Sequence, residues 1–308
     1  MSPSVVVVGT FVKDLSFHCE RFPGAGETVH GAFATCPGGK GFNQAVASAR
    51  AGATARFVGA VGRDPFGAEA RAFLKSEGID ARLAAKRGLS TGAAAVLVDA
   101  SGQNQIVVAV GAGAAILPRD VPPALIRGAR VVICQREANE VINLHAFRHA
   151  RRFGATTIFN PAPMGPGFDP AVLALTDVLI PNESEFAALT RHAPSGGPGE
   201  THGRCRALGV GTVIVTMGRE GCLVSTETGW TRISGHRVRA VDTTGAGDAF
   251  VGAFAAALVR FGGDVLRAAR YGNAAAALSV TRHGTSPSMP RRREVDRFVK
   301  TRSGARSS

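Results

Sequence analysis

This chain of 308 residues has few Trp and Tyr residues and no closely spaced cysteine pair. Each shortage argues against a class of protein. One Trp and one Tyr argue against an aromatic surface for stacking nucleic-acid bases. The five cysteines are odd in number, widely spaced and without a C-x-x-C pair, which argues against a disulfide framework and a structural zinc site. We therefore expect reduced cysteines and a cytoplasmic protein.

Long hydrophobic runs are also missing. The apolar run at residues 5–8 is too short for a signal peptide and has no basic segment before it, and no other stretch reaches the length of a membrane span. We therefore expect no membrane association.

The charge is strongly of one sign, with a formal net charge of +13. Seven Lys or Arg against two acidic residues after residue 290 place about +5 of this charge in the C-terminal tail. No basic stripe is interleaved with aromatic residues, so we expect no nucleic-acid partner. A positive field suits an anionic substrate such as a nucleotide.

Short apolar runs alternate with helical patterns along most of the chain. Such alternation predicts an α/β fold, with a central, mostly parallel sheet and helices on both of its faces. The predicted strands lie at residues 5–9, 56–61, 131–134, 156–159, 177–180 and 212–216, and predicted helices at 66–77, 137–153 and 183–190.

Two segments break this alternation, at residues 11–35 and 91–110. Both contain stretches typical of strands, and Ser101-Gly102 marks a turn inside the second. They predict a small β-sheet attached to a single domain that spans residues 1–308. Because an exposed sheet leaves strand edges unpaired, we expect two copies to form a homodimer there.

Residues 241–250, V-D-T-T-G-A-G-D-A-F, join a turn of small residues to a carboxylate at the start of an apolar helix. Gly245, Ala246 and Gly247 have so little side chain that their backbone N–H groups can turn toward a bound anion. The helix that follows would point its positive end at the same place. Asp248 could act there as a base or stabilise the helix start, and the motif alone leaves both open.

A second glycine-rich segment, C-P-G-G-K-G-F-N-Q, begins at Cys36 and leads into a helix of small residues. Its glycines predict a tight backbone turn. Neither segment is a general phosphate-binding loop, because both G-x-x-x-x-G-K-[ST] and G-x-G-x-x-G are absent.

The two segments resemble the C-terminal and N-terminal signatures of the ribokinase-like (PfkB) family of sugar and nucleoside kinases. The resemblance implies a ribokinase-like α/β fold, in which residues 11–35 and 91–110 form a β lid over the sugar. It implies transfer of the γ-phosphate of ATP to a sugar hydroxyl, D-ribose first, with another sugar or a nucleoside as the alternative. Six further segments match the family in order, at residues 23–29, 61–67, 160–163, 181–185, 216–221 and 280–288.

The resemblance also implies roles for individual residues. Asp248 would be the catalytic base, and the amides of Gly245, Ala246, Gly247 and Asp248 would stabilise the transferring phosphoryl group. The residues expected at the sugar are Asp14, Gly39, Lys40, Gly41, Asn43 and Glu137. Those expected at the nucleotide are Asn182, Thr216, Gly218, Gly221 and Asn273, with Glu185 holding Mg²⁺ through water.

A potassium site is implied as well, so the expected cofactors are ATP, Mg²⁺ and K⁺. The residues of this site would be Asp242, Thr244, Ser279, Arg282, Gly284 and Ser288. Structural alternatives stay open for several residues: a turn carboxylate at Asp14, and helix starts at Asn43, Glu137 and Asn182. A catalytically silent binding protein would be expected to lose Asp248 or the glycine turn, and both are present.

Three residues depart from the family pattern near the expected sugar site. Val12-Lys13 precedes Asp14 where ribokinases have Asn-Ala or similar, and Phe42 replaces a small residue before Asn43. These changes predict a reshaped sugar pocket.

His145 and His149 have the i, i+4 spacing of metal ligands, but no third ligand is apparent and we expect a structural role.

Overall fold

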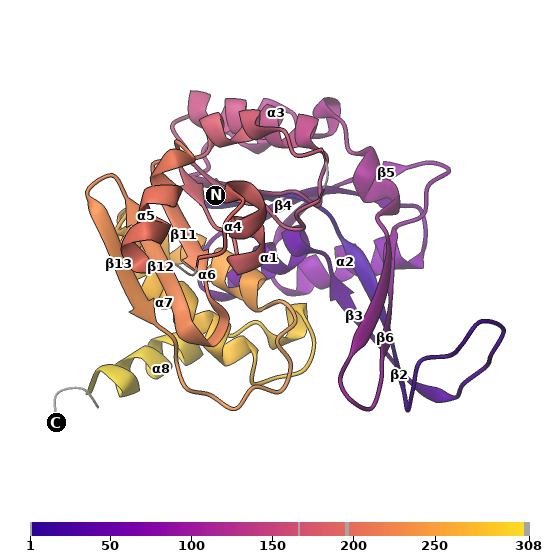
Figure 1. Ribbon diagram of the computed structural model, residues 1–308. Helices are drawn as coiled ribbons and strands as arrows, with labels where there is room; N and C mark the ends of the chain where they lie inside the picture. Colours follow the sequence, from indigo (N-terminus) through magenta and orange to yellow (C-terminus); the bar gives the residue numbers. More distant parts are fainter. Residues whose placement is uncertain (1, 166, 195–196, 305–308) are drawn as a thin grey trace.

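A computed structural model describes residues 2–165, 167–194 and 197–304, and it arranges them as a large sheet flanked by helices and a small separate sheet (Figure 1). The large sheet has the strand order β13-β12-β11-β10-β9-β8-β1-β4-β5. All its neighbours pair in parallel except β11 with β12 and β12 with β13. The strands are β1 (Val5–Val8), β4 (Ala55–Gly62), β5 (Asp80–Lys86), β8 (Val131–Gln135), β9 (Thr156–Asn160), β10 (Val178–Leu179), β11 (Thr212–Thr216), β12 (Gly221–Thr226) and β13 (Gly229–Ser234).

Strand β1 lies inside the sheet, and its four valines are fully buried. Successive side chains of a strand point to opposite faces, and Val5 and Val7 belong to one hydrophobic cluster while Val6 and Val8 belong to another. Helices therefore cover both faces of the sheet, which confirms the predicted fold class. The first face packs α1 (Lys40–Arg50), α2 (Pro65–Ser76), α6 (Ala246–Arg260), α7 (Val265–Ser279) and α8 (Arg292–Gly304), and the second packs α3 (Glu140–Arg152), α4 (Glu183–Thr190) and α5 (Pro198–Ala207).

All six strands predicted from the apolar runs are present, but one helix begins later than expected. Helix α3 starts at Glu140 instead of residue 137, because the side chain of Asn139 accepts a hydrogen bond from the N–H of Ile142 (3.0 Å) and caps the helix there. Residues 136–138 remain a turn. Among the described helices, none is long and apolar enough to cross a membrane.

The strand order reverses at β1, which has β4 on one side and β8 on the other. In open α/β sheets, ligands bind beyond the carboxyl ends of the strands at such a reversal. The loops that follow β1 and β8 begin with Gly9 and Arg136, so a site is expected where these loops meet the helix starts of α1 and α6.

The small sheet, which we call the lid, has the order β3-β2-β6-β7 and extends away from the main sheet at the lower right of Figure 1. Its strands are β2 (Val12–Cys19), β3 (Gly31–Gly38), β6 (Gly92–Val98) and β7 (Asn104–Ala109). Directly paired residues lie on one face of a sheet. By register, Phe17 and Phe33 lie on the face opposite that of Asp14, and so does Val107. These three side chains are 43%, 60% and 71% exposed, so this outer face of the lid is apolar and open.

Candidate active site

Glycines let α1 approach both the sheet and α6 closely. A Cβ on Gly41 would lie 2.8 Å from the Cα of Gly9, and one on Gly252 would lie 2.4 Å from the carbonyl oxygen of Gln44. Real Cβ atoms do not approach other atoms so closely. The glycine-rich turn therefore lets α1 dock tightly against β1 and α6, which brings its first side chains to Asp248.

Asp248 lies in the first turn of α6 and is 6% exposed. Its carboxylate accepts hydrogen bonds from Nδ2 of Asn43 (3.0 Å) and Nε2 of Gln44 (2.9 Å). Burial raises the pKa of Asp248 above its usual range, although the charge of Lys40 and the two amides act against this rise. A buried carboxyl held by a neighbouring helix is placed to accept a proton, and the role of Asp248 as the catalytic base stays a prediction.

The N-terminus of α6 faces a cavity of about 140 Å³. Gly245 is the N-cap, with a φ of 77° that favours glycine, and the first N–H groups of a helix have no carbonyl partner within it. Gly245, Ala246, Gly247 and Asp248 line the cavity. The positive end of the helix thus meets the cavity where an anion would bind. The other residues lining it include Lys40, Asn160, Asn182, Glu185, Thr216 and Thr243.

A larger cavity of about 640 Å³ lies apart from these groups, beside α4 and α5. Its lining is mostly apolar, with Phe168, Leu173 and Leu189 among its side chains, and Arg191 is its charged residue. The carboxylates Glu185 and Asp248 instead line the smaller cavity, and we place the candidate site there.

Glu137 follows β8 and lies beside the start of α1. It accepts hydrogen bonds from the hydroxyl of Thr10 and from the N–H of Lys40 (2.8 Å for the latter). The alternative that Glu137 begins a helix is wrong, because α3 starts three residues later. Burial raises the pKa of Glu137, with the hydrogen bonds from Thr10 and Lys40 opposing the rise. The carboxyl is thus held at the point where the strand order reverses.

Asp14 comes from the lid strand β2 and completes this group of carboxyls. A Cβ on Gly38 would lie 2.2 Å from Oδ2 of Asp14, so the first glycine of the turn leaves room for the carboxylate. Burial raises the pKa of Asp14 to about 6, and the nearby charges of Glu137 and Asp248 add to the rise. The hydroxyl of Thr285 lies 3.5 Å from the same oxygen. Asp14 therefore changes charge near neutral pH.

Lys40 supplies positive charge among these acids. Burial lowers its pKa, but the charges of Asp248, Glu137 and Glu185 outweigh that effect and leave the pKa above its usual value. Lys40 therefore stays positively charged at neutral pH. A fixed cation beside the start of α6 strengthens the attraction for a phosphate group.

Asn182 and Glu185 form a capping box at the start of α4. The side chain of Asn182 accepts from the N–H of Glu185 (2.8 Å), and that of Glu185 accepts from the N–H of Asn182 (2.9 Å). The helix-start alternative for Asn182 is therefore present in the structure. Both residues also line the cavity, as does Thr216, and burial raises the pKa of Glu185. A nucleotide-binding role is compatible with the cap and stays a prediction.

Three other residues expected at the nucleotide are held in different ways, two glycines by backbone conformation and Asn273 by a side-chain hydrogen bond. Gly218 and Gly221 have φ of 46° and 95°, and a Cβ on Gly221 would lie 2.1 Å from the carbonyl oxygen of Ile233. Asn273 lies on α7 and donates to the carbonyl oxygen of Ser234 (2.9 Å). Among the described residues, the cavity lining includes none of these three.

Three of the residues expected at potassium, Asp242, Thr244 and Gly284, are joined by hydrogen bonds. The carboxylate of Asp242 accepts from the N–H of Thr244 (2.9 Å) and from the N–H of Gly284 (2.9 Å). Burial raises the pKa of Asp242, but these hydrogen bonds outweigh it and the pKa lies below its usual value. The turn before α6 and the segment after α7 are thus joined. Of the others, Ser279 ends α7, Arg282 pairs with Glu294, and Ser288 is buried in the short helix Ser286–Ser288.

Sequence reasoning missed Gln44, which is fully buried. Its Nε2 donates to Asp248 and to Oδ1 of Asn160 (3.1 Å), and its Oε1 accepts from Nε2 of Gln135 (2.7 Å). The sequence did offer a signal for Gln44: it is a polar amide in a helix of small residues that was expected to pack closely. Sequence reasoning also missed the protein contacts of Asn43, whose amide donates to Asp248 and accepts from the hydroxyl of Ser286 (2.6 Å); its contact with the sugar stays a prediction.

Phe42 and Lys13, which are expected to reshape the sugar pocket, both contact other protein side chains in the structure. Phe42 is fully buried and packs edge-on against Phe11, with ring centroids 4.8 Å apart. Lys13 is 4% exposed and pairs with Glu69 of α2 (2.5 Å). Alternation along β2 points Lys13 away from the face of Asp14. Both side chains are therefore held by contacts within the protein, and a reshaped sugar pocket stays a prediction.

His145 and His149 stack edge to face, with ring centroids 4.7 Å apart. Within the described part of the chain, no three His, Cys, Asp or Glu side chains gather closely enough to hold a metal ion by themselves. Any metal in the candidate site would need oxygens from phosphate and water as well.

Comparison with known proteins places this geometry in a family. The family model described as "pfkB family carbohydrate kinase" matches residues 2–292. A ribokinase of Mus musculus is 39% identical, over 95% of this chain and 93% of its own length. A deoxyribokinase of Salmonella typhi is 33% identical, over 96% of this chain and 98% of its own. A solved structure of Arabidopsis thaliana ribokinase with ribose and ATP superimposes with a TM-score of 0.91 at 32% identity, covering 97% of this chain and 99% of that one.

Proposed function

The chain belongs to the pfkB family of carbohydrate kinases, and we propose that it transfers the γ-phosphate of ATP to a hydroxyl of D-ribose, giving ribose 5-phosphate. The observation that carries the proposal is the position of Asp248. Its buried carboxyl lies at the positive end of α6, inside the cavity and beside Lys40. One place thus offers both a proton acceptor and an anion site, which is what phosphoryl transfer to a hydroxyl needs.

The reaction assigns a separate task to each group. Asp14 and Glu137 would hold sugar hydroxyls, since both are carboxyls beside the start of α1. Asp248 would accept the proton as the sugar oxygen attacks the γ-phosphorus, and ADP would leave. The N–H groups of Ala246 and Gly247, with the charge of Lys40, would stabilise the equatorial oxygens of the transferring group. Alignment and charge stabilisation supply most of the acceleration in such reactions.

We propose that Glu185 helps to hold Mg²⁺. Glu185 is a buried carboxyl in the cavity lining, and Mg²⁺ prefers oxygen ligands and keeps several waters. One carboxylate from the chain, together with water and phosphate, therefore fits this ion. When bound, Mg²⁺ neutralises charge on the β- and γ-phosphates. Asn182, Thr216, Gly218, Gly221 and Asn273 are proposed to surround the nucleotide.

We also propose that K⁺ binds near Asp242 and Gly284, two of the six residues expected at potassium. The support is the pair of hydrogen bonds that hold the turn before α6 against residues 284–288. A cation there would steady the turn that carries Gly245 and Ala246. Equal activity in potassium-free buffer and in buffer with potassium would rule this out.

We propose that the protein acts as a homodimer in the cytoplasm. The outer face of the lid, with Phe17, Phe33 and Val107, suits a second copy because large apolar side chains there are open to water. A cytoplasmic location is supported by the five cysteines, which are all free thiols.

The decisive experiment measures ADP release with ribose, 2-deoxyribose, fructose, nucleosides and sugar phosphates. We expect the highest kcat/KM with ribose. A higher value with 2-deoxyribose, the substrate class named for the Salmonella relative, would replace ribose. No ADP release with any acceptor would refute the kinase and favour a silent binding protein.

The role of Asp248 is tested with Asp248→Asn, which keeps the shape of the side chain and removes its basicity. We expect kcat to fall by about 10²–10⁴-fold while the affinity for ATP, measured by calorimetry, changes little. A variant that keeps a tenth of the wild-type kcat would show that another group takes the proton.

A further inference from the structure

Arg50, in the last turn of α1, is joined to Glu77 at the end of α2 by a two-pronged ion pair. Its Nε lies 3.0 Å from Oε2 of Glu77, and its Nη2 lies 2.6 Å from Oε1. The two side chains are only 10% and 9% exposed. A planar guanidinium matches a carboxylate in this way, and the pairing fixes its orientation as well as its position.

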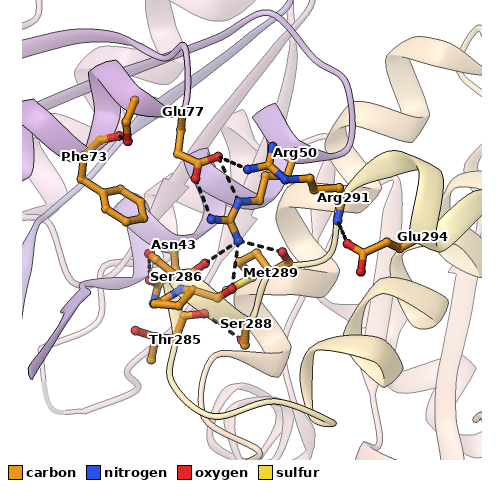
Figure 2. A network of polar contacts seen from close by, with 12 residues as sticks. Asn43, Arg50, Phe73, Glu77, Thr285, Ser286, Ser288, Met289, Arg291 and Glu294 are labelled. Atoms are coloured by element: carbon orange, nitrogen blue, oxygen red, sulfur yellow. Dashed lines mark hydrogen bonds and ion pairs between the residues drawn. The ribbon is translucent and has the colours of Figure 1, made fainter. Parts of the chain in front are cut away.

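The remaining nitrogen of Arg50 holds a loop. Nη1 lies within hydrogen-bond distance of the carbonyl oxygens of Ser286 (3.1 Å), Pro287 (3.0 Å) and Met289 (2.8 Å). Figure 2 shows Arg50 between Glu77 on one side and this backbone on the other. The guanidinium therefore ties the segment after α7 to α1 and α2.

The same segment reaches the candidate base. The hydroxyl of Ser286 donates to Oδ1 of Asn43 (2.6 Å), and Nδ2 of Asn43 donates to Asp248 (3.0 Å). Asn43 and Arg50 are seven residues apart on α1, which is two helical turns and hence the same face of the helix. The segment thus lies along α1 and is held at both ends, by Asn43 near the site and by Arg50 away from it.

This arrangement accounts for the amide of Asn43. With its oxygen facing the Ser286 hydroxyl, the amide must present its NH₂ group to the carboxylate of Asp248. A displaced Ser286 would free the amide to turn. A buried ion pair contributes little net stability, because desolvation offsets most of the attraction between its charges. What the pair of Arg50 and Glu77 does contribute is the position of the segment.

We infer that Arg50 and Glu77 are positioning residues for phosphoryl transfer: they hold residues 286–289 so that Ser286 orients Asn43, and Asn43 orients Asp248. The inference rests on the proposed kinase function and adds to it two residues that do not touch the cavity. Arg50 acts on the base through three contacts, from the opposite end of α1, and Glu77 acts through its ion pair with Arg50.

The test compares Arg50→Lys with a matched control, Arg56→Lys. A single ammonium cannot bridge a carboxylate on one edge and carbonyls on the other, so the variant keeps the charge and loses the geometry. Arg56 makes similar contacts, since its guanidinium joins Asp80 (2.6 Å) and the carbonyl oxygen of Leu125 (2.6 Å). It lies near the start of β4, at the end of the strand away from the candidate site. We expect Arg50→Lys to lower kcat roughly tenfold, with KM for ribose and ATP within about twofold. Arg56→Lys should leave kcat unchanged.

The route is tested in the background Ser286→Ala, which keeps the backbone carbonyls but removes the hydroxyl. If Arg50 acts through Ser286, adding Arg50→Lys to this background should lower kcat much less than it does in the wild type. A full further loss would overturn the route. Equal loss in Arg50→Lys and Arg56→Lys would overturn the positioning role, and Glu77→Gln repeats the comparison if Arg50→Lys does not fold.

Hydrogen exchange of residues 284–290 supplies a readout without any substrate. Exchange in this segment should be faster in Arg50→Lys than in wild type, and unchanged in Arg56→Lys. Unchanged exchange in Arg50→Lys would refute the clamp whether or not the wild type phosphorylates ribose. A wild type that releases no ADP would instead refute the proposed function alone.

Discussion

Gln44→Leu removes one of the two amides that hold Asp248 and keeps most of the buried volume. In the wild type, Nε2 of Gln44 lies 2.9 Å from Oδ1 of the carboxylate. Asn160 would keep its place, because its own Nδ2 still donates to the carbonyl oxygen of Ile180 (2.8 Å). The variant therefore isolates the contact between Gln44 and the base from most of its surroundings.

The size of the effect follows from the charge on the acceptor. A hydrogen bond to an ionised group contributes about 1.5–3 kcal/mol, which corresponds to about one to two pKa units. This bond favours the ionised form, so its loss raises the pKa of Asp248 further above the usual range. At a given pH a smaller fraction of the base is then ionised, and the acid limb of the kcat/KM profile moves to higher pH by that amount.

Stability should fall as well. Nε2 of Gln135 loses its acceptor, and Oε1 of the same side chain is already buried without a hydrogen-bond partner. One unpaired buried amide lowers the free energy of unfolding by about 1–3 kcal/mol. Chemical denaturation measures this loss and shows whether the variant is folded at the assay temperature.

The assay is ADP release with ribose over a series of pH values that extends above the usual titration range of a carboxyl. Ser48→Ala is the matched control: its hydroxyl donates to the carbonyl oxygens of Gln44 and Gly252 at the same helix contact, and it does not touch Asp248. It should lower stability and leave the pH profile in place. A profile that stays in place in Gln44→Leu would refute the reasoning.

The other predictions concern the sugar, the metal and the lid. Because Asp14 has a pKa of about 6 in the folded protein and is ionised above it, KM for ribose should rise several-fold as the pH falls from 7 to 5, and this rise should be absent in Asp14→Asn. Glu185→Gln should raise the Mg²⁺ concentration for half-maximal activity by about 10-fold or more, with thermal unfolding as the check on folding. Val107→Glu should shift sedimentation toward a monomer, whereas Val141→Glu, at an exposed position of α3, should not; a wild type that is already a monomer would refute the dimer.

The fold was accessible from the sequence because backbone periodicity and burial act locally. Apolar runs such as Val5–Val8 reflect a strand covered on both faces, and small residues between Gly41 and Ala49 reflect a helix that must dock closely. The wrong start predicted for α3 also has a local cause. Residues 137–139 are compatible with a helix by pattern, but the cap at Asn139 makes the helix begin after them.

Side-chain partners were much less accessible, because they depend on which helices meet. Nothing near Asp248 in the chain indicates that its carboxylate is held by Asn43 and Gln44, about two hundred residues earlier. The packing of Phe42 was not accessible for the same reason: its place beside Phe11 and Phe73 depends on how α1 lies on the sheet.

The pairing of β2 with β6 in the lid has a consequence for folding kinetics. These strands are parallel, with Val12 opposite Gly92, so eighty residues containing α1, β4, α2 and β5 separate the partners. The two local hairpins, β2 with β3 and β6 with β7, can form early, but closing the long loop between them carries an entropic penalty until the intervening segment has folded. We therefore expect the lid to assemble after the central sheet, and in a chain still being synthesised the edge of β2 remains unpaired until β6 has emerged.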